Sequence, residues 1–189
     1  MRHLTAGMAG ADSWSTDAHK TLNVPYDSGL AIVRDGRAMH RALSMHASYL
    51  QATEVGADPH ERVPELSRRA RGVPVWAVLR ALGRSGVAEL VDGLAAAARG
   101  LADGIGRLPG VEVLNEVVFT QLCIALADDD ATEALSERLW AEGDVLAMTS
   151  RWHDRAVVRF SVSNWATDAA EVRRTIDAVA RARVSVVSA

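Results

Sequence analysis

The sequence is poor in cysteine, in aromatic residues and in long apolar runs, and it has no surplus of positive charge. Its one cysteine, Cys123, excludes an internal disulfide framework and a zinc site built from several cysteines. The net charge is −3, from 21 basic and 24 acidic side chains, which argues against a nucleic-acid-binding protein with a basic face. No apolar run approaches the roughly 20 residues that span a bilayer, and residues 1–7 lack the apolar core of a signal peptide. A cytoplasmic protein is therefore expected.

Length and composition are those of a soluble globular chain. The 189 residues are 49% hydrophobic and 24% charged, which is enough for one large domain or two small ones. No internal repeat is visible, and this excludes a solenoid. The histidines other than His19 share no ligand spacing on one helix face, so no metal site is expected.

Loop signals dominate the first third of the sequence. Serine, threonine, aspartate, asparagine and proline between Asp12 and Gly29 predict a loop that builds a site. The apolar run Leu30–Val33 predicts a short buried strand. Residues 45–64 contain two prolines and show no sustained period, which predicts a long surface loop of the kind that often serves as a mobile lid.

Helices and strands alternate in the remainder of the sequence. Apolar residues at helical spacing predict helices over residues 74–82 and 87–108, with a break at Gly83–Gly86. Further strands are predicted at 111–114, 118–126, 145–149 and 156–163, and further helices at 131–142 and from 167–168 onward. The β-β-α-β-β-α order indicates a small α+β domain that begins near Asp103, with an antiparallel sheet and helices on one face.

One stretch, Ala11–Lys20, is richer in chemistry than the rest. It reads Ala-Asp-Ser-Trp-Ser-Thr-Asp-Ala-His-Lys and contains the only lysine of the chain. A lysine amine in a polar turn can attack a carbonyl carbon once it has lost its proton, and a nearby cation, a phosphate or partial burial sets the pKa of that loss. Taken alone, a His-Lys pair is also typical of a solvated surface.

The stretch closely resembles the lysine motif of the pyridoxal-phosphate-dependent group II amino-acid decarboxylases, which include the aromatic-amino-acid, histidine and glutamate decarboxylases. Further matches run in order from about Arg2 to about Val184, and they are Asn23–Gly29, Tyr49–Leu50, Ser67–Arg69 with Trp76, and Val157–Asn164. The resemblance implies a fold type I, transferase-like α/β fold, with pyridoxal 5′-phosphate as cofactor and an amino acid as substrate. It assigns residues 1–73 to the end of the large cofactor-binding domain, 74–102 to connecting helices and 103–189 to a small α+β domain.

The resemblance also implies roles for individual residues. Lys20 is the residue that holds the cofactor covalently, and His19 lies next to the cofactor phosphate, with a turn-stabilising role as the alternative. Asp17 stands where relatives often have asparagine. It is assigned to the cofactor-binding residues, although a carboxylate there would repel the phosphate unless it is protonated or turned away. Arg159 resembles an arginine that pairs with the substrate carboxylate through its guanidinium fork, and an ion pair at the strand edge is the alternative.

Tyr49 is similar to a tyrosine on a mobile catalytic loop of the family. After carbon dioxide is lost, the substrate Cα needs a proton, and a phenol on a closing loop can deliver it. The alternative for Tyr49 is a loop anchor with a half-buried ring.

Three parts of such a site have no counterpart in the sequence before Lys20. In the family, the aspartate on the pyridine nitrogen, the histidine on the ring and the main phosphate-binding turn all precede the lysine. The resemblance therefore predicts the C-terminal part of a longer, homodimeric enzyme, inactive by itself. One alternative is another fold type I lyase or aminotransferase, such as a cysteine-desulfurase-like enzyme, against which Tyr49 and Ser67–Arg69 argue. The other is a dimerising remnant without activity.

Overall fold

The computed structural model describes residues 2–44 and 58–187. The chain divides into two compact units: an N-terminal unit of residues 1–19 and 24–81, and a C-terminal unit of residues 20–23 and 82–189. The three-part division expected from the sequence, with boundaries at residues 73 and 102, stays a prediction. Among the described residues, no helix combines the length and the apolar character that a membrane span requires.

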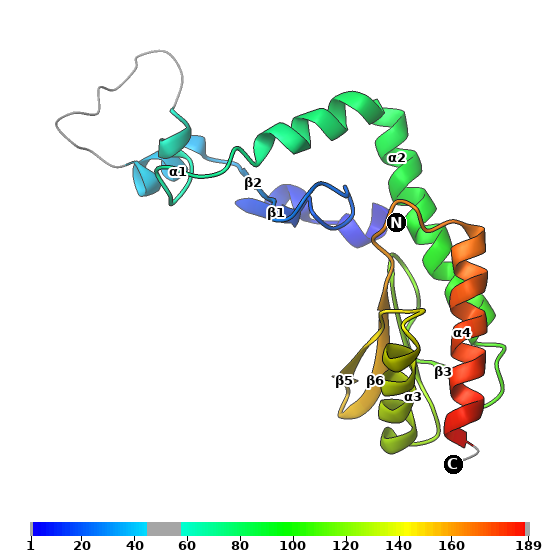
Figure 1. Ribbon diagram of the computed structural model, residues 1–189. Helices are drawn as coiled ribbons and strands as arrows, with labels where there is room; N and C mark the ends of the chain where they lie inside the picture. The colour runs from blue at the N-terminus through cyan, green and yellow to red at the C-terminus, as the bar shows by residue number, and fades with distance from the viewer. Residues whose placement is uncertain (1, 45–57, 188–189) are drawn as a thin grey trace. The chain divides into compact units, whose positions relative to one another are not determined.

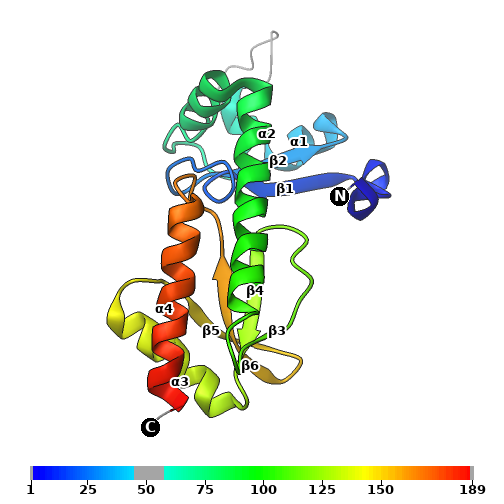
Figure 2. The ribbon, with the colours of Figure 1, turned by 90° about the vertical axis from the view of Figure 1, so that its right-hand side faces the viewer.

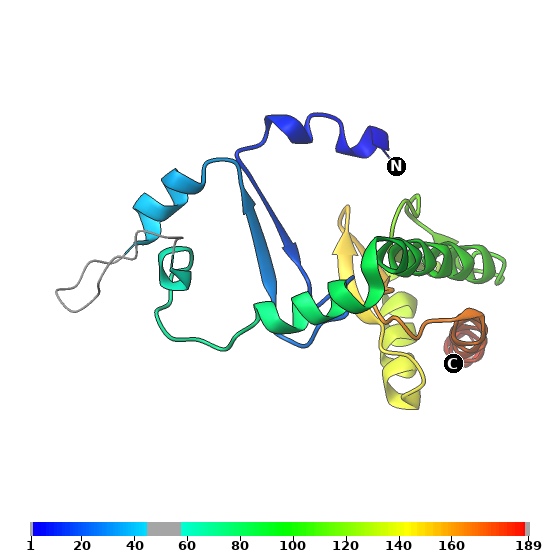
Figure 3. The same cartoon turned by 90° about the horizontal axis from the view of Figure 1, so that it is seen from above.

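The regular elements of the N-terminal unit are short helices, a two-stranded hairpin and the beginning of a long helix. Its elements are η1 (Arg2–Thr5), η2 (Met8–Gly10), β1 (Ser13–Asp17), β2 (Gly29–Val33), α1 (Gly36–Leu43), η3 (Pro59–Glu61) and the first part of α2 (Gly72–Ile105). The two strands pair antiparallel, from Ser13 opposite Val33 to Asp17 opposite Gly29, and Figure 3 shows them as a long ribbon.

The hairpin corrects two expectations from the sequence. Residues 13–17 form a strand, whereas the polar composition of residues 12–29 predicted a loop. Trp14 is the one apolar residue of this strand, so no apolar alternation predicted it, and the strand forms through backbone pairing with β2. Residues 30–33 do form a strand, but it is not buried, since Ile32 is 54% exposed. Two strands alone supply no layer to cover either face.

Helix α2 crosses from one unit into the other. Its backbone leaves helical geometry at Gly83, where φ is 61° and ψ is −171°. Glycine suits this position because it has no Cβ, which at a positive φ would crowd the neighbouring backbone. The predicted interruption is therefore confirmed, but it lies at Gly83, and Arg84 and Ser85, where the break was expected, are helical. The helix ends at Ile105, three residues before the predicted end.

The C-terminal unit is a four-stranded antiparallel sheet with helices packed against it. Its further elements are β3 (Glu112–Val113), β4 (Gln121–Ala125), α3 (Asp129–Glu142), β5 (Met148–Trp152), β6 (Arg155–Ser161) and α4 (Ala169–Val187). The sheet order is β3-β4-β6-β5, and every neighbouring pair is antiparallel. The predicted β-β-α-β-β-α order is confirmed. The strand expected at residues 145–149 begins at Met148 instead, where pairing with Arg159 of β6 starts.

The core of this unit lies between the sheet and its helices. Leu122 pairs with Phe160 and Ile124 with Val158, and all four side chains belong to the buried apolar cluster. Helices α2, α3 and α4 contribute most of the rest of the cluster, including Leu101, Leu135, Leu139 and Val179. Figures 1 and 2 both show α4 beside the C-terminal half of α2, and the absent side chain of Gly104 makes room there for Ile176.

Candidate functional site

The loop between β1 and β2 carries the His-Lys pair, and backbone hydrogen bonds define its base. The Ala18 N–H donates to the Ser28 carbonyl at 2.8 Å, and the Val24 N–H donates to the Ala18 carbonyl at 3.2 Å. Ala18, Val24 and Ser28 are all buried. Backbone hydrogen bonds therefore close the loop at both ends of residues 18–28.

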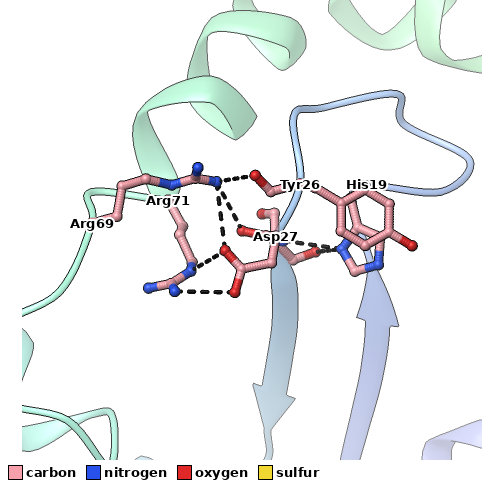
Figure 4. Close-up of polar contacts among 6 residues, drawn as sticks. His19, Tyr26, Asp27, Arg69 and Arg71 are labelled. Atoms are coloured by element: carbon pink, nitrogen blue, oxygen red, sulfur yellow. Dashed lines mark hydrogen bonds and ion pairs between the residues drawn. The ribbon is translucent and has the colours of Figure 1, made fainter.

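The His19 ring has a defined orientation. Its Nδ1 lies 3.0 Å from both the N–H and the carbonyl oxygen of Ser28. That carbonyl already accepts from the N–H groups of Ala18 and His19, which uses both of its lone pairs. The network therefore assigns Nδ1 as the acceptor of the Ser28 N–H, which leaves the ring proton on Nε2. The Tyr26 ring packs against the His19 ring, with ring centroids 4.0 Å apart and planes tilted by 36° (Figure 4).

Lys20 follows immediately and its side chain is exposed. The Asn23 N–H donates to the Lys20 carbonyl at 3.1 Å, which closes a tight turn behind the lysine. Asp17, at the end of β1, is half-buried and pairs with Gly29. Asp17, His19 and Lys20 therefore follow one another closely at the end of β1, and their roles toward a cofactor stay predictions.

Two arginines, Arg69 and Arg71, bind the end of the loop that precedes β2. Arg71 binds the Asp27 carboxylate with both ends of its guanidinium group, through Nε at 2.9 Å and Nη2 at 3.0 Å. Arg69 donates to the Tyr26 carbonyl and lies 3.5 Å from the same carboxylate (Figure 4). Hydrogen bonding from Arg71 is the largest cause that lowers the pKa of Asp27, to about 2. Sequence reasoning singled out Ser67–Arg69 but missed Arg71, although an arginine-rich stretch and a lone aspartate of opposite charge were signals.

Arg159 lies on β6 with an exposed side chain, opposite Cys123 of β4. This pair alternates with the core-facing pairs of the sheet, so it lies on the face away from the apolar cluster. Partial burial raises the pKa of the Cys123 thiol, and the Arg159 charge opposes that effect. Such a thiol is a poor nucleophile, and a contact between Arg159 and a substrate stays a prediction.

Tyr49 lies outside the described residues. Within residues 2–44 and 58–187, no group of three histidine, cysteine, aspartate or glutamate side chains is placed to hold a metal ion.

Comparison with solved structures identifies the fold. Oryza sativa TDC with PLP and tryptamine superposes with a TM-score of 0.89 at 23% identity, over 97% of this chain and 41% of that chain. Mouse CSAD superposes with a TM-score of 0.82 at 20% identity, over 96% of this chain and 42% of that chain. The chain therefore has the fold of the corresponding part of the fold type I decarboxylases, in agreement with the predicted α/β class.

Sequence comparison identifies the family. The family described as "Pyridoxal-dependent decarboxylase conserved domain" matches residues 1–127. Histidine decarboxylase of Drosophila melanogaster is 33% identical over 166 residues, which are 84% of this chain and 19% of the relative. Aromatic-L-amino-acid decarboxylase of Bacillus atrophaeus is 26% identical over 179 residues, which are 88% of this chain and 37% of the relative. The chain belongs to the pyridoxal-dependent decarboxylase family, and it spans between about a fifth and two fifths of the proteins that it matches.

Proposed function

We propose that this chain carries the lysine-bearing part of a pyridoxal-phosphate-dependent amino-acid decarboxylase, with Lys20 as the residue that binds the cofactor covalently. The observation that carries the proposal is the position of Lys20. The only lysine of a chain in this family lies exposed in a tight turn, directly after a histidine with a defined ring orientation.

The residues of the loop fit the cofactor chemically. A primary amine is the group that bonds to an aldehyde, and Lys20 supplies it after losing its proton. His19 keeps its proton on Nε2 and can donate that N–H to a phosphate oxygen. Asp17 joins the set only in its protonated form, because an ionised carboxylate would repel the phosphate. When bound, pyridoxal phosphate supplies an electron sink that lets the bond between the substrate Cα and its carboxylate break.

Two more residues of this chain belong to the proposed site. Arg159 offers a guanidinium fork to the carboxylate of an amino-acid substrate, and its exposed position on β6 supports this role. Tyr49 delivers a proton to the substrate Cα after carbon dioxide has left. Its support is the similarity of the Tyr49–Leu50 segment to the family.

The activity belongs to the longer protein in this proposal. The matched relatives are more than twice as long as this chain, and the pyridine-nitrogen aspartate is expected in the part that the chain does not match. We infer that the complete protein is a cytoplasmic homodimer and that these 189 residues, which cover only part of the matched proteins, have no turnover of their own.

Chemical trapping of the cofactor tests the assignment of Lys20. The chain is incubated with pyridoxal phosphate, reduced with borohydride, digested and mapped by mass spectrometry. We expect the added mass on the peptide that contains Lys20, because an exposed amine beside a phosphate-binding histidine reacts faster than an isolated one.

The control is Lys20→Arg, which keeps the positive charge and removes the only side-chain amine. This variant should carry at most the N-terminal label. A wild-type chain labelled at the N-terminal amine and not at Lys20 contradicts the proposal.

A further inference from the structure

Asn23 makes more hydrogen bonds than any role in closing a simple turn requires. Its Nδ2 donates to the Lys20 carbonyl at 3.2 Å, to the Thr21 carbonyl at 3.3 Å and to the Ser163 carbonyl at 2.6 Å. Its Oδ1 accepts from the Trp165 N–H at 3.0 Å. One amide group therefore serves four backbone partners, with one N–H shared between the two turn carbonyls.

The backbone conformation of Asn23 also restricts which residues suit this position. Its φ of 53° lies in the left-handed region, which asparagine tolerates better than most other side chains. Two requirements meet at this position: a positive φ, and a short side chain with both a donor and an acceptor. Aspartate meets the first requirement and lacks the donor, and glycine meets the first and has no side chain.

The partners of Asn23 lie in two places that are far apart in sequence. Lys20 and Thr21 form the lysine turn, whereas Ser163 and Trp165 follow β6, and Asn23 and Ser163 are 140 residues apart. All of these residues belong to the C-terminal unit. The amide thus joins the turn behind the lysine to the segment between β6 and α4.

The segment that receives Asn23 is itself firmly held. The Asn164 side chain accepts from the Ala166 N–H at 3.0 Å, and the Thr167 N–H donates to the Asn164 carbonyl at 3.0 Å. The Asp168 carboxylate then accepts from the N–H groups of Ala170 and Glu171 at 2.8 Å and 2.9 Å, which caps α4. Asn23 is therefore anchored to a rigid connection rather than to a free loop.

We propose that Asn23 is the positioning residue for Lys20. Its side chain stabilises the turn of residues 20–23 and bonds that turn to residues 163–165. The backbone of Lys20 is thereby held in a fixed position within the C-terminal unit. This inference rests on the proposed function for the part that concerns the cofactor. The anchoring itself depends only on the four hydrogen bonds.

Amide hydrogen exchange in the full chain tests the anchoring. In Asn23→Gly, the Trp165 N–H loses its acceptor, and its exchange should accelerate about tenfold, the effect of one hydrogen bond. Asn23→Asp keeps the Oδ1 acceptor, so the Trp165 N–H should stay protected. The amide of residue 23, which closes the turn on Lys20, should exchange faster in both variants, because neither has the donor that braces the turn.

The matched control is Asn164→Asp, which makes the same asparagine-to-aspartate change at a residue whose side-chain oxygen accepts from the Ala166 N–H. Asn164 uses its side-chain oxygen as an acceptor there, and aspartate preserves it. Exchange at residues 23 and 165 should equal that of the wild type. Cooperative thermal unfolding, followed by circular dichroism, shows whether each variant remains folded.

Borohydride trapping of pyridoxal phosphate tests the consequence for Lys20. Labelling of Lys20 should be several-fold slower in Asn23→Gly and Asn23→Asp than in the wild type and in Asn164→Asp, because the lysine loses its fixed position. Equal labelling rates and equal exchange in all four proteins overturn the inference. An unlabelled Lys20 in the wild type overturns the proposed function instead, and the exchange rates then still decide whether Asn23 anchors the turn.

Discussion

The two units of this chain differ in how they bury apolar surface. Of the buried hydrophobic residues in the described part, only Ala18, Val24 and Val75 belong to the N-terminal unit, and all others belong to the C-terminal unit. In the N-terminal unit, Trp14 and Ile32 of the hairpin are 38% and 54% exposed. In the C-terminal unit, the paired strands β4 and β6 bury the apolar side chains of one face against three helices.

Burial of apolar side chains therefore stabilises mainly the C-terminal unit of the described chain. A two-stranded hairpin has no layer to cover it, whereas a four-stranded sheet with helices on it encloses a continuous core. The loop with His19 therefore depends on local hydrogen bonds. The segment with Lys20 and Asn23 is grouped with the unit that has the core.

Truncating one large side chain in each unit tests this comparison most strongly. Leu139 of α3 is completely buried, so Leu139→Ala should lower the free energy of unfolding by about 2–5 kcal/mol, from lost burial and the cavity left behind. Ile32 is 54% exposed, so Ile32→Ala should change it by about 0.5 kcal/mol. Urea unfolding followed by circular dichroism measures both. Equal losses would show that the hairpin also belongs to a packed core.

Alanine substitutions at two glycines of α2 test how closely this helix packs on α4 in the C-terminal unit. A Cβ at Gly104 would overlap the Ile176 side chain, so Gly104→Ala should destabilise by about 1 kcal/mol, since the cost of overpacking exceeds the gain in helix propensity. At Gly100 the nearest atom is Val172 Cγ1 at 3.5 Å, an ordinary contact. Gly100→Ala should therefore be neutral or stabilise by up to about 1 kcal/mol. Thermal unfolding of both variants gives the ranking, and a reversed ranking contradicts the packing of α2 on α4.

The smallest effect on stability is expected in the N-terminal unit, at the exposed ion pair of Asp27 with Arg71. The pKa of Asp27 is about 2 in the folded chain, below its ordinary value of 3.8. Its contribution is therefore fully present above pH 3.8 and is lost as the pH falls through about 2. An NMR titration of the carboxyl carbon should give a midpoint near 2.

Arg71→Gln removes the main cause of that shift and should return the midpoint toward 3.8. Arg69→Gln is the matched control. Its charge is the last of the causes, so the midpoint should move little. A midpoint near 3.8 in the wild type would show that the two side chains do not pair in solution.

Much of the C-terminal unit was predictable, because its residues follow the periods of its elements. The strand predicted at residues 156–163 corresponds to β6, and Asp168, expected at the start of the last helix, caps α4. The strand after α3 was misplaced by three residues, because Val145–Ala147 is apolar but does not pair. Leu146 is 73% exposed, Ala147 joins the core, and pairing with β6 begins only at Met148.

The N-terminal unit was less predictable, for a different reason. Residues 13–17 include the strand-favouring Trp14 and Thr16 but show no apolar alternation, and the strand forms because it pairs with β2 across the loop. The chemistry of the loop, by contrast, was readable from the residues. His19 and Lys20 are adjacent, and a lysine motif is a local pattern.

The sequence by itself determined the family, the lysine motif and the order of the C-terminal elements, because these depend on neighbouring residues and on short periods. Only the tertiary structure decided that Arg71 binds Asp27 across 44 positions and that Asn23 binds Ser163 across 140. Such partners are chosen by chain geometry after the strands and helices have packed. A short side chain makes a hydrogen bond only over about 3 Å, and no local pattern reveals which distant backbone group will arrive within that reach.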